Sequence, residues 1–491
     1  DCHLSWQHTL QCTRRSPLIR IICIVMTRPL RSYALLLCLL CSVSVTGWAQ
    51  HRSPKRGFCT NEMAYRENFE ALATGCSWFY NWSYKAPNVL QNDFENINMD
   101  YVPMVWGWGQ ENYQADLIAY LEQHPNIRYI LGYNEPNFSA QANMSPRQAA
   151  AKWHEIEEIA DRFNLQIVGP AVNFAAQDAT CCDTIDGKQV CYADPFDYYN
   201  AFFEACPDCR VDYLGLHLYM PAGAYKPYID RLSAEHGNRQ VWLTEFNYNG
   251  GGTADTTAHI NFITSELESL EKNPNVFRYA WFMSYGMARH ANLVAPGQGK
   301  LTTLGKVYTQ LSAFDTTYYH QTDTRIEAEH FITQIGCMVR PSTDDSTLMI
   351  RDFESGKSAS YLVEIPAAGT YYFHPRWATK AGSEVRLYID DVLVSTIKPA
   401  ATGDFSTWGE EDFPITLTAG KHTLKIYSAS RMFYLNWFRL NSQLSALPAV
   451  SATSSGTQKI LYNGEVIILH NSKAYNLLGI PLSPVPASLP R

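Results

Sequence analysis

The stretch Tyr129-Ile130-Leu131-Gly132-Tyr133-Asn134-Glu135-Pro136-Asn137 decides the fold. Its apolar start suits a buried strand, and Pro136 ends that strand just after Asn134 and Glu135, because proline cannot donate a ladder hydrogen bond. The stretch Val241-Trp242-Leu243-Thr244-Glu245-Phe246 has the same build. Catalytic groups of a (β/α)8 barrel lie at the C-terminal ends of its strands. The two stretches therefore predict such a barrel, with one glutamate at each of two strand ends.

Short apolar or aromatic runs recur between residue 54 and about residue 320, and most are followed by a segment of helix length. One such segment begins at Ser145-Pro146, an N-cap with a first-turn proline, and carries Trp153, Ile156 and Ile159 at helical spacing. Eight strand and helix units fit a (β/α)8 TIM barrel better than a doubly wound sheet. The predicted strands are Lys55–Cys59, Cys76–Trp82, Tyr101–Trp106, Tyr129–Tyr133, Gln166–Ala171, Val211–Tyr219, Val241–Phe246 and Arg278–Tyr285.

Helical periodicity ends after about residue 321. From Arg325 to Leu440 the sequence alternates in short strands, such as Val385–Ile389 and His422–Ile426, separated by turn signals. This spacing predicts an all-β sandwich or jelly roll.

The two ends of the chain carry other signals. Arg28 and Arg31 precede the apolar run Tyr33–Val45 and then Gly47-Trp48-Ala49, the order of a secretory signal peptide whose apolar run is too short to span a membrane. We therefore expect a protein that is secreted or at the cell surface, periplasmic or extracellular. The expected parts are upstream translation that is not protein (1–25), the signal peptide (26–49), the catalytic domain (50–320), the jelly roll (322–441), a linker (442–458) and a small β-hairpin that is a tag or docking element (459–491).

Composition excludes some partners. The net charge is -8 and no basic run occurs, so nucleic acid is not an expected partner. Aromatic residues make up 13% of the chain, which fits either an aromatic-rich core or flat platforms for sugar rings. A monomer is expected.

Cysteines cluster between Cys181 and Cys209. In a chain that leaves the cytoplasm they could form one or two disulfides within a long loop. A zinc site at Cys206-Pro207-Asp208-Cys209 is the competing interpretation, although no second pair at suitable spacing follows.

Two carboxyl groups placed across a glycosidic bond can protonate the leaving oxygen and stabilise an oxocarbenium-like centre. The ends of the fourth and seventh predicted strands face each other across a barrel mouth. We therefore predict a retaining double displacement without a cofactor, with Glu135 as acid and then base and Glu245 as nucleophile. Asn134 would bind the sugar 2-hydroxyl, a contact that strengthens in the transition state.

Other strand ends supply candidate helpers. His217 and Tyr219 alternate to one face of the sixth strand, where Tyr219 could donate a hydrogen bond that keeps Glu245 ionised. His217 could bind a substrate hydroxyl or be a hydrogen-bonded core histidine. Trp281 could form the floor under a pyranose ring. Further candidate substrate contacts are Trp106, Trp108 and Asn173.

These motifs, in this order, resemble family 128 of the glycoside hydrolases. The similarity rests on Leu131–Asn137, Asn143–Pro146 with Trp153, Gly169–Ala171, Val211–Tyr219 and Trp242–Phe246. It implies a β-1,3-glucanase that works by retention on laminarin-like glucan, with Glu135 matching the acid/base and Glu245 the nucleophile of the family. The loop from Cys181 to Cys191 is longer than expected for the family. Whether such an enzyme cleaves within the glucan chain or from its end depends on loops of this kind.

The second part is similar to family 6 carbohydrate-binding modules. It opens with Arg325–Glu329, continues through Ala359–Tyr371 and closes with Tyr434–Phe438. Glu327 and Glu329 lie on one face of a strand and match the structural calcium site of such modules, or they are a surface pair of acids. Trp408 and Asn436 match the ring and the amide of the glycan site of the family. The terminal hairpin resembles a sorting segment of type IX secretion.

The leading hypothesis is thus a secreted endo-β-1,3-glucanase with an appended binding module, acting in polysaccharide degradation. A retaining barrel hydrolase of β-1,4-linked glycans is a close alternative, since its strand ends carry the same residues. A non-catalytic glycan-binding or adhesion protein is the alternative from another class.

Overall fold

The computed structural model describes residues 52–61, 63–90, 94–109, 113–248, 255–286, 290–444, 457–462, 465–470 and 473–475. The predicted upstream segment, the signal peptide, most of the linker and the end of the chain lie outside the described residues.

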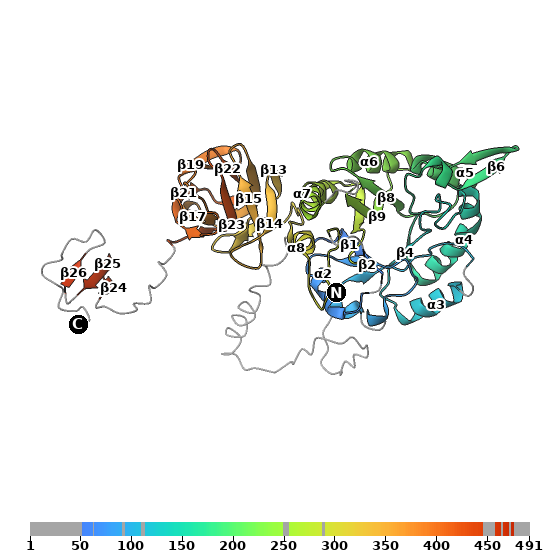
Figure 1. The fold of residues 1–491 in the computed structure, drawn as a ribbon, viewed down its shortest axis with the longest axis horizontal. Helices are drawn as coiled ribbons and strands as arrows, with labels where there is room; N and C mark the ends of the chain where they lie inside the picture. The colour runs from blue at the N-terminus through green and yellow to red at the C-terminus, as the bar shows by residue number, and fades with distance from the viewer. Residues whose placement is uncertain are drawn as a thin grey trace, which may run out of the picture. The chain divides into compact units, whose positions relative to one another are not determined.

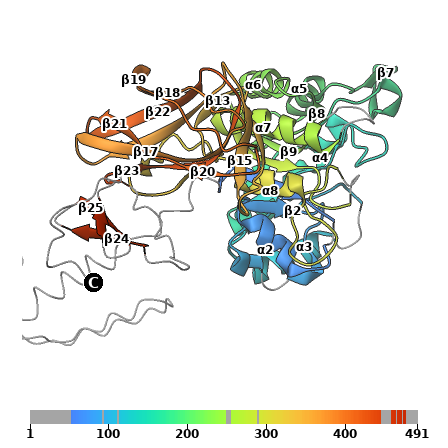
Figure 2. The same ribbon diagram turned by 60° about the vertical axis from the view of Figure 1, so that its left-hand side comes forward.

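The first part of the chain alternates strands with helices. Figure 1 shows the helices α2 to α8 arranged around the strands, and Figure 2 gives a second view. The helices are α2 (Arg66–Ala73), α3 (Tyr113–Gln123), α4 (Pro146–Phe163), α5 (Pro195–Ala205), α6 (Tyr225–Glu235), α7 (Thr256–Lys272) and α8 (Thr303–Gln310), with short 3-10 turns η1 (Asn88–Leu90), η2 (Phe94–Ile97) and η3 (Gln177–Ala179). The strands are β1 (Arg56–Cys59), β2 (Trp78–Tyr80), β3 (Asp100–Tyr101), β4 (Tyr129–Leu131), β5 (Gln166–Val168), β8 (Leu214–Met220), β9 (Val241–Tyr248) and β10 (Val276–Trp281). Each predicted strand overlaps one of them.

All pairs between these strands are parallel. A sheet runs in the order β3-β2-β1-β10-β9-β8, and β4 pairs with β5. A parallel bridge from Met104 to Leu131 links the segment after β3 to β4, and a bridge from Val168 to Tyr213 links β5 to the segment before β8. The catalytic part is therefore an α/β domain, as parallel strands joined by helices require.

Helix α4 begins where the sequence predicted. Ser145 accepts a hydrogen bond from the N–H of Gln148, whose side chain in turn accepts from the N–H of Ser145, which forms a capping box before Pro146. On the buried face Trp153 packs edge-on against Tyr133. A Cβ atom on Gly132 would lie 2.8 Å from the Trp153 ring and 2.9 Å from the Val168 carbonyl oxygen. The helix thus packs directly on the strand that leads into Glu135.

The segment between β5 and α5 carries an antiparallel hairpin, β6 (Cys182–Ile185) and β7 (Lys188–Cys191). A disulfide joins Cys182 to Cys191 across this hairpin, and a second joins Cys206 to Cys209 after α5. The predicted cysteine cluster therefore forms two disulfides.

The second part is all-β, and no helix occurs among the described residues 311–444 (Figure 2). One sheet has the order β11-β16-β22-β18-β19 with β13 beside β16, and the other has the order β14-β15-β23-β17-β20 with β12 beside β23 and β21 beside β17. The strands are β11 (His320–Gln321), β12 (Ile326–Glu327), β13 (Thr333–Ile335), β14 (Met338–Pro341), β15 (Leu348–Phe353), β16 (Ser358–Ile365), β17 (Gly369–Ala378), β18 (Val385–Ile389), β19 (Val392–Ile397), β20 (Gly409–Glu410), β21 (Phe413–Leu417), β22 (Gly420–Ser428) and β23 (Phe433–Asn441).

The terminal segment forms three antiparallel strands where a hairpin was predicted: β24 (Thr457–Tyr462), β25 (Glu465–His470) and β26 (Lys473–Tyr475). In the part of the chain that the structure describes, no helix combines the length and the apolar character needed to cross a membrane.

Candidate active site

Glu135 lies just beyond β4. Its backbone has φ of 39°, in the left-handed region that non-glycine residues seldom adopt, and its N–H donates to the Ala171 carbonyl at 2.8 Å. The residue is 8% exposed, and its Oε1 accepts a hydrogen bond from Asn173 Nδ2 at 2.9 Å. The backbone and Asn173 together fix the direction of this carboxylate.

Glu245 lies within β9 and is 4% exposed. Its Oε2 accepts a hydrogen bond from the Tyr219 hydroxyl at 2.5 Å. Its Oε1 accepts from Trp82 Nε1 at 2.8 Å and lies 3.3 Å from the Tyr80 hydroxyl, which also lies 3.1 Å from the Thr244 carbonyl. Three donors therefore surround one buried carboxylate, an arrangement that favours its ionised form.

A bulge in β9 turns Glu245 toward this site. Trp242 belongs to a buried cluster whose members come from strands and the segments that continue them, with no helix residue among them. Strict alternation would give Glu245 the opposite face. The register to β8 shifts between Leu216 and His217, so that Leu216 is opposite Leu243 but His217 is opposite Glu245. The extra residue of β9 restores Glu245 to the inner face, and bulges of this kind are frequent next to active sites.

His217 connects the two glutamates. It is fully buried, and its Nδ1 lies 3.1 Å from Glu135 Oε1 and 3.3 Å from Glu245 Oε2. One ligand atom from each of the three side chains can be chosen so that all three lie within 4.8 Å of one another. The two carboxylates are thus close enough to act on one bond.

The charge of His217 changes the pKa of both glutamates, and both glutamates change the pKa of His217. Burial raises the pKa of Glu245, assisted by the charge of Glu135 and opposed by His217 and by the Tyr219 and Trp82 donors. Burial opposes ionisation of Glu135 as well, but the hydrogen bond and the charge of His217 outweigh it and lower the pKa of Glu135. For His217, burial lowers the pKa, yet the two glutamates reverse this and raise it overall. A proton in this site is therefore held more firmly by His217 than by Glu135.

Asn134 lies beside Glu135 and is 4% exposed. Its Nδ2 donates to Gln141 Oε1 at 3.3 Å, whereas its Oδ1 has no partner among the described residues. That oxygen is a buried acceptor without a donor in the described part of the chain, and solvent does not reach it in the structure. Trp106 is half-buried and packs against the cluster of strand residues that includes Trp242. Trp108 is 44% exposed, and Lys152 Nζ lies 4.2 Å from its ring centre.

Three predicted substrate contacts occupy other positions. Asn173 Nδ2 binds Glu135, and His217 Nδ1 lies between Glu135 and Glu245. These two polar groups therefore contact the carboxylates, where contacts with a sugar hydroxyl were predicted. Trp281 is fully buried, donates its indole N–H to the Ala291 carbonyl at 2.9 Å and packs edge-on against Phe246. The prediction that Trp281 forms a sugar floor is therefore corrected, because its ring has no free face.

Sequence reasoning missed Trp82, Tyr80 and Phe282. Trp82 closes the second predicted strand, so the strand-end rule that found the glutamates could have found it. Phe282 is half-buried and contacts Trp82 and Tyr219 edge-on at 5.7 and 5.6 Å between ring centres. Since neighbouring residues of a strand point to opposite faces, Phe282 is turned toward the site and Trp281 away from it.

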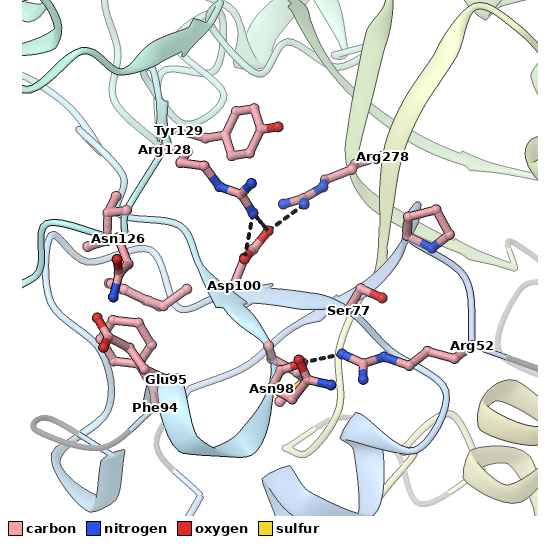
Figure 3. A pocket seen from close by; sticks show the side chains of 14 residues that line it. Arg52, Ser77, Phe94, Glu95, Asn98, Asp100, Asn126, Arg128, Tyr129 and Arg278 are labelled. Atoms are coloured by element: carbon pink, nitrogen blue, oxygen red, sulfur yellow. Dashed lines mark hydrogen bonds and ion pairs between the residues drawn. The ribbon is translucent and has the colours of Figure 1, made fainter. Parts of the chain in front are cut away.

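A separate hollow of about 410 Å³ lies at the opposite, N-terminal ends of these strands. Asp100 at the start of β3 binds Arg278 at 2.5 Å and Arg128 at 3.2 Å there (Figure 3). Asp100, Arg128 and Arg278 of this hollow pair with one another, at the ends of the strands opposite to those that carry the glutamates.

The all-β part contains the second predicted site. Trp408 is half-buried and donates its indole N–H to Thr343 Oγ1 at 3.3 Å. Asn436 is fully buried, and its Nδ2 donates to Asp344 Oδ2 at 3.0 Å while its Oδ1 accepts from Thr347 at 3.2 Å. The prediction that the Asn436 amide binds a glycan hydroxyl is thus corrected: both ends of the amide bind the loop that carries Thr343, Asp344 and Thr347.

The predicted metal ligands lie at the start of this part. Arg325 binds Glu327, with 2.6 Å between Nε and Oε1. Glu329 is almost fully buried, and its Oε1 accepts from the N–H of Leu348 at 3.1 Å. Its Oε2 is buried with no partner among the described residues, and burial first, then the charge of Glu327, raises the pKa of Glu329. A buried carboxylate oxygen without a donor is what a bound cation would satisfy, so the residues fit a hard cation such as calcium.

A family model described as glycosyl hydrolase catalytic core matches residues 57–308, just over half of the chain. The chain belongs to this family and is a glycoside hydrolase. The carbohydrate binding module (family 6) model matches residues 327–442 of this glycoside hydrolase, so the resemblance of both parts noted from the sequence is confirmed.

Solved structures similar to this glycoside hydrolase include members of family 128. An endo-β-1,3-glucanase of subgroup II from Sorangium cellulosum is 33% identical, with 52% of this chain and 97% of that chain covered and a TM-score of 0.45. A curdlan-specific exo-β-1,3-glucanase of subgroup III from Blastomyces gilchristii is 29% identical, with 53% and 100% covered and a TM-score of 0.42. Alkali-sensitive linkage protein 1 of Schizosaccharomyces pombe is 25% identical over 269 residues, and the match spans 52% of this chain but 44% of that protein.

Proposed function

We propose that this glycoside hydrolase cleaves β-1,3-glucan by a retaining double displacement at Glu135 and Glu245. The observation that carries the proposal is the approach of the two carboxylates, whose oxygens meet within 4.8 Å on either side of His217. Retaining enzymes hold their carboxyl groups about 5 to 5.5 Å apart, whereas inverting enzymes leave about 6.5 to 9.5 Å for a water molecule.

We infer that the catalytic part is a closed (β/α)8 barrel and that the all-β part is a jelly roll. Parallel pairs and bridges connecting β1, β2, β3, β4, β5, β8, β9 and β10 in a ring support the first inference. Two sheets with buried side chains between them, such as Tyr361 against Phe438, support the second.

In the first half-reaction, Glu245 attacks the anomeric carbon while Glu135 protonates the leaving glycosidic oxygen. Glu135 first needs a proton. His217 Nδ1, 3.1 Å from Glu135 Oε1, can supply it as the substrate oxygen replaces water around the carboxylates. Tyr219, Trp82 and Tyr80 meanwhile hold Glu245 in the carboxylate form that attacks.

In the second half-reaction, Glu135 is a carboxylate and removes a proton from a water molecule that attacks the glycosyl ester on Glu245. The proton taken from that water can return from Glu135 to His217, which restores the starting state. Asn134 Oδ1 accepts from the sugar 2-hydroxyl in both steps, and Phe282 is the aromatic floor in place of Trp281.

Sequence identity favours β-1,3-glucan as the substrate and an endo mode of cleavage. The chains with 33% identity are named as endo-β-1,3-glucanases, and the match covers 97% and 98% of them. The family 6 module would retain the enzyme on insoluble glucan, with Trp408 as its stacking ring. We further propose calcium at Glu327 and Glu329, secretion through the segment 26–49 and a monomeric state.

Hydrolysis of laminarin, set beside a panel of β-1,4-linked mannan, xylan and glucan, tests the substrate class. We expect activity on laminarin alone, with the β-anomer formed first when the products are followed by NMR. Glu135→Gln and Glu245→Gln should each lower kcat by about a thousandfold or more. Activity confined to β-1,4 glycans would show that the proposed substrate is wrong. Unchanged activity in both variants would show that Glu135 and Glu245 are not the catalytic residues.

A further inference from the structure

A second cluster of metal-binding side chains lies away from the glutamates, between the middle of α4 and the C-terminal end of α5. His154 lies on α4, and Cys206 and Cys209 follow α5. One ligand atom of each can be chosen so that the three lie within 4.8 Å of one another. In the structure the two cysteines form a disulfide. They are the Cys-x-x-Cys pair for which zinc was the competing interpretation.

The distances around Cys206 match those of a tetrahedral zinc site. With a Zn–S bond of about 2.3 Å and a Zn–N bond of about 2.0 to 2.1 Å, two ligand atoms at the tetrahedral angle lie about 3.6 Å apart. His154 Nε2 lies 3.8 Å from Cys206 Sγ, and Asp208 Oδ1 lies 3.6 Å from the same sulfur. The imidazole is therefore placed for a metal on Cys206 without moving either helix.

The other nitrogen of the His154 ring is held as in established zinc sites. His154 Nδ1 lies 2.5 Å from Glu157 Oε2, so this carboxylate fixes the ring and directs Nε2 toward the sulfurs. The second carboxylate oxygen, Oε1 of Glu157, accepts from the backbone N–H of Arg210, directly after Cys209. Zinc-binding histidines nearly always donate their second N–H to such a partner.

Solvent reaches the cluster. His154 is exposed, and His154, Cys206 and Asp208 line a surface hollow of about 530 Å³. A reductant and a metal ion can therefore enter, and the hollow leaves a fourth coordination position for water or for Asp208.

We propose that the dithiol form of Cys206 and Cys209, together with His154, binds one Zn²⁺ ion. A dithiol reductant breaks the Cys206–Cys209 bond: two electrons and two protons pass to the two sulfurs, and the reductant becomes its own disulfide. Zinc then replaces the two thiol protons, which leave to solvent, and the sulfurs move apart to about 3.8 Å. The segment then has two covalent states. The disulfide closes only the loop after α5, whereas the zinc thiolate would also join this loop to His154 on α4.

Cobalt(II) is the probe, since thiolate ligands give it a charge-transfer absorption that carboxylates and imidazole do not. The full chain is reduced with a dithiol, freed of it by anaerobic gel filtration and titrated with Co²⁺, then with Zn²⁺ in competition. We expect one equivalent of Co²⁺ with this absorption in the reduced protein and none in the oxidised protein.

Variants separate this site from other thiols. The double variant Cys206→Ser with Cys209→Ser should lose the absorption, whereas Cys182→Ser with Cys191→Ser, which removes the other disulfide, should keep it. Glu157→Gln leaves all three ligands in place and should weaken binding by about 10 to 100-fold. His154→Gln should weaken it at least as much. Circular dichroism checks that each variant is folded.

Three results would overturn the proposal: no thiolate absorption in the reduced protein, an absorption that survives the loss of Cys206 and Cys209, or equal affinity in His154→Gln and the parent. Hydrolysis of laminarin is an independent readout, so failure of the metal site leaves the catalytic proposal untouched.

Discussion

Removing the Tyr219 hydroxyl should shift the acid limb of the pH profile to higher pH. This hydroxyl donates to Glu245 Oε2 at 2.5 Å, and the pKa of Glu245 is already raised, first by burial and then by the charge of Glu135. A hydrogen bond to a charged group contributes about 1.5 to 3 kcal/mol, and one pKa unit corresponds to about 1.4 kcal/mol. In Tyr219→Phe the pKa of Glu245 should therefore rise by about one to two units. Below that pKa the nucleophile is protonated, so activity on the acid side falls.

The assay is kcat/KM for laminarin hydrolysis between pH 3 and 9. Tyr225→Phe is the matched control, because the Tyr225 hydroxyl is buried and donates to the Asn247 carbonyl of β9 at 2.7 Å, with no hydrogen bond to a carboxylate among the described residues. We expect a loss of about 10 to 100-fold for Tyr219→Phe at the pH optimum of the parent, and an unmoved acid limb for Tyr225→Phe. Equal profiles for the parent and Tyr219→Phe, or equal shifts in the two variants, would refute the reasoning.

Three further outcomes follow from the same geometry. His217→Asn removes a group whose pKa the two glutamates raise, so we expect the alkaline limb of kcat/KM to move to lower pH in this variant than in the parent. Phe282→Ala should raise KM several-fold, whereas Trp281→Phe should change thermal stability and leave KM unchanged. A raised KM in Trp281→Phe and an unchanged KM in Phe282→Ala would show that Trp281, and not Phe282, contacts the substrate. Gly132→Ala places a Cβ atom 2.8 Å from the Trp153 ring and should destabilise the protein by about 1 to 3 kcal/mol in urea unfolding, and no loss would show that α4 can move away from β4.

The sequence predicted the parts of the site that depend on strand ends. Each parallel strand delivers its last residues to the same edge, so a glutamate at the end of two strands had to lie near its counterpart. This reasoning placed Glu135, Glu245 and Tyr219 without knowledge of their contacts. It needed only the positions where apolar runs stop.

For Trp281 and Phe282 the direction of the side chain could not be obtained in this way. Strands of a parallel sheet are buried on both faces, so their sequences are apolar throughout and do not mark the inner face. Trp281 and Phe282 were equally suitable aromatics by composition. Only the packing of Trp281 against Phe246 shows which of the two is directed away from the site.

The case of Glu245 shows how a correct prediction can rest on a feature that the sequence hides. By alternation from Trp242, which lies in the cluster of strand residues, the inner position is Thr244 and Glu245 points toward the helices. The extra residue of β9 reverses that parity at the one position where the chemistry needs a carboxylate. Nothing in Val241–Phe246 marks a bulge, since no glycine or proline interrupts it. The bulge is therefore imposed by neighbours, and the three donors on β2, β8 and the segment after β2 are the interactions that turning Glu245 inward satisfies.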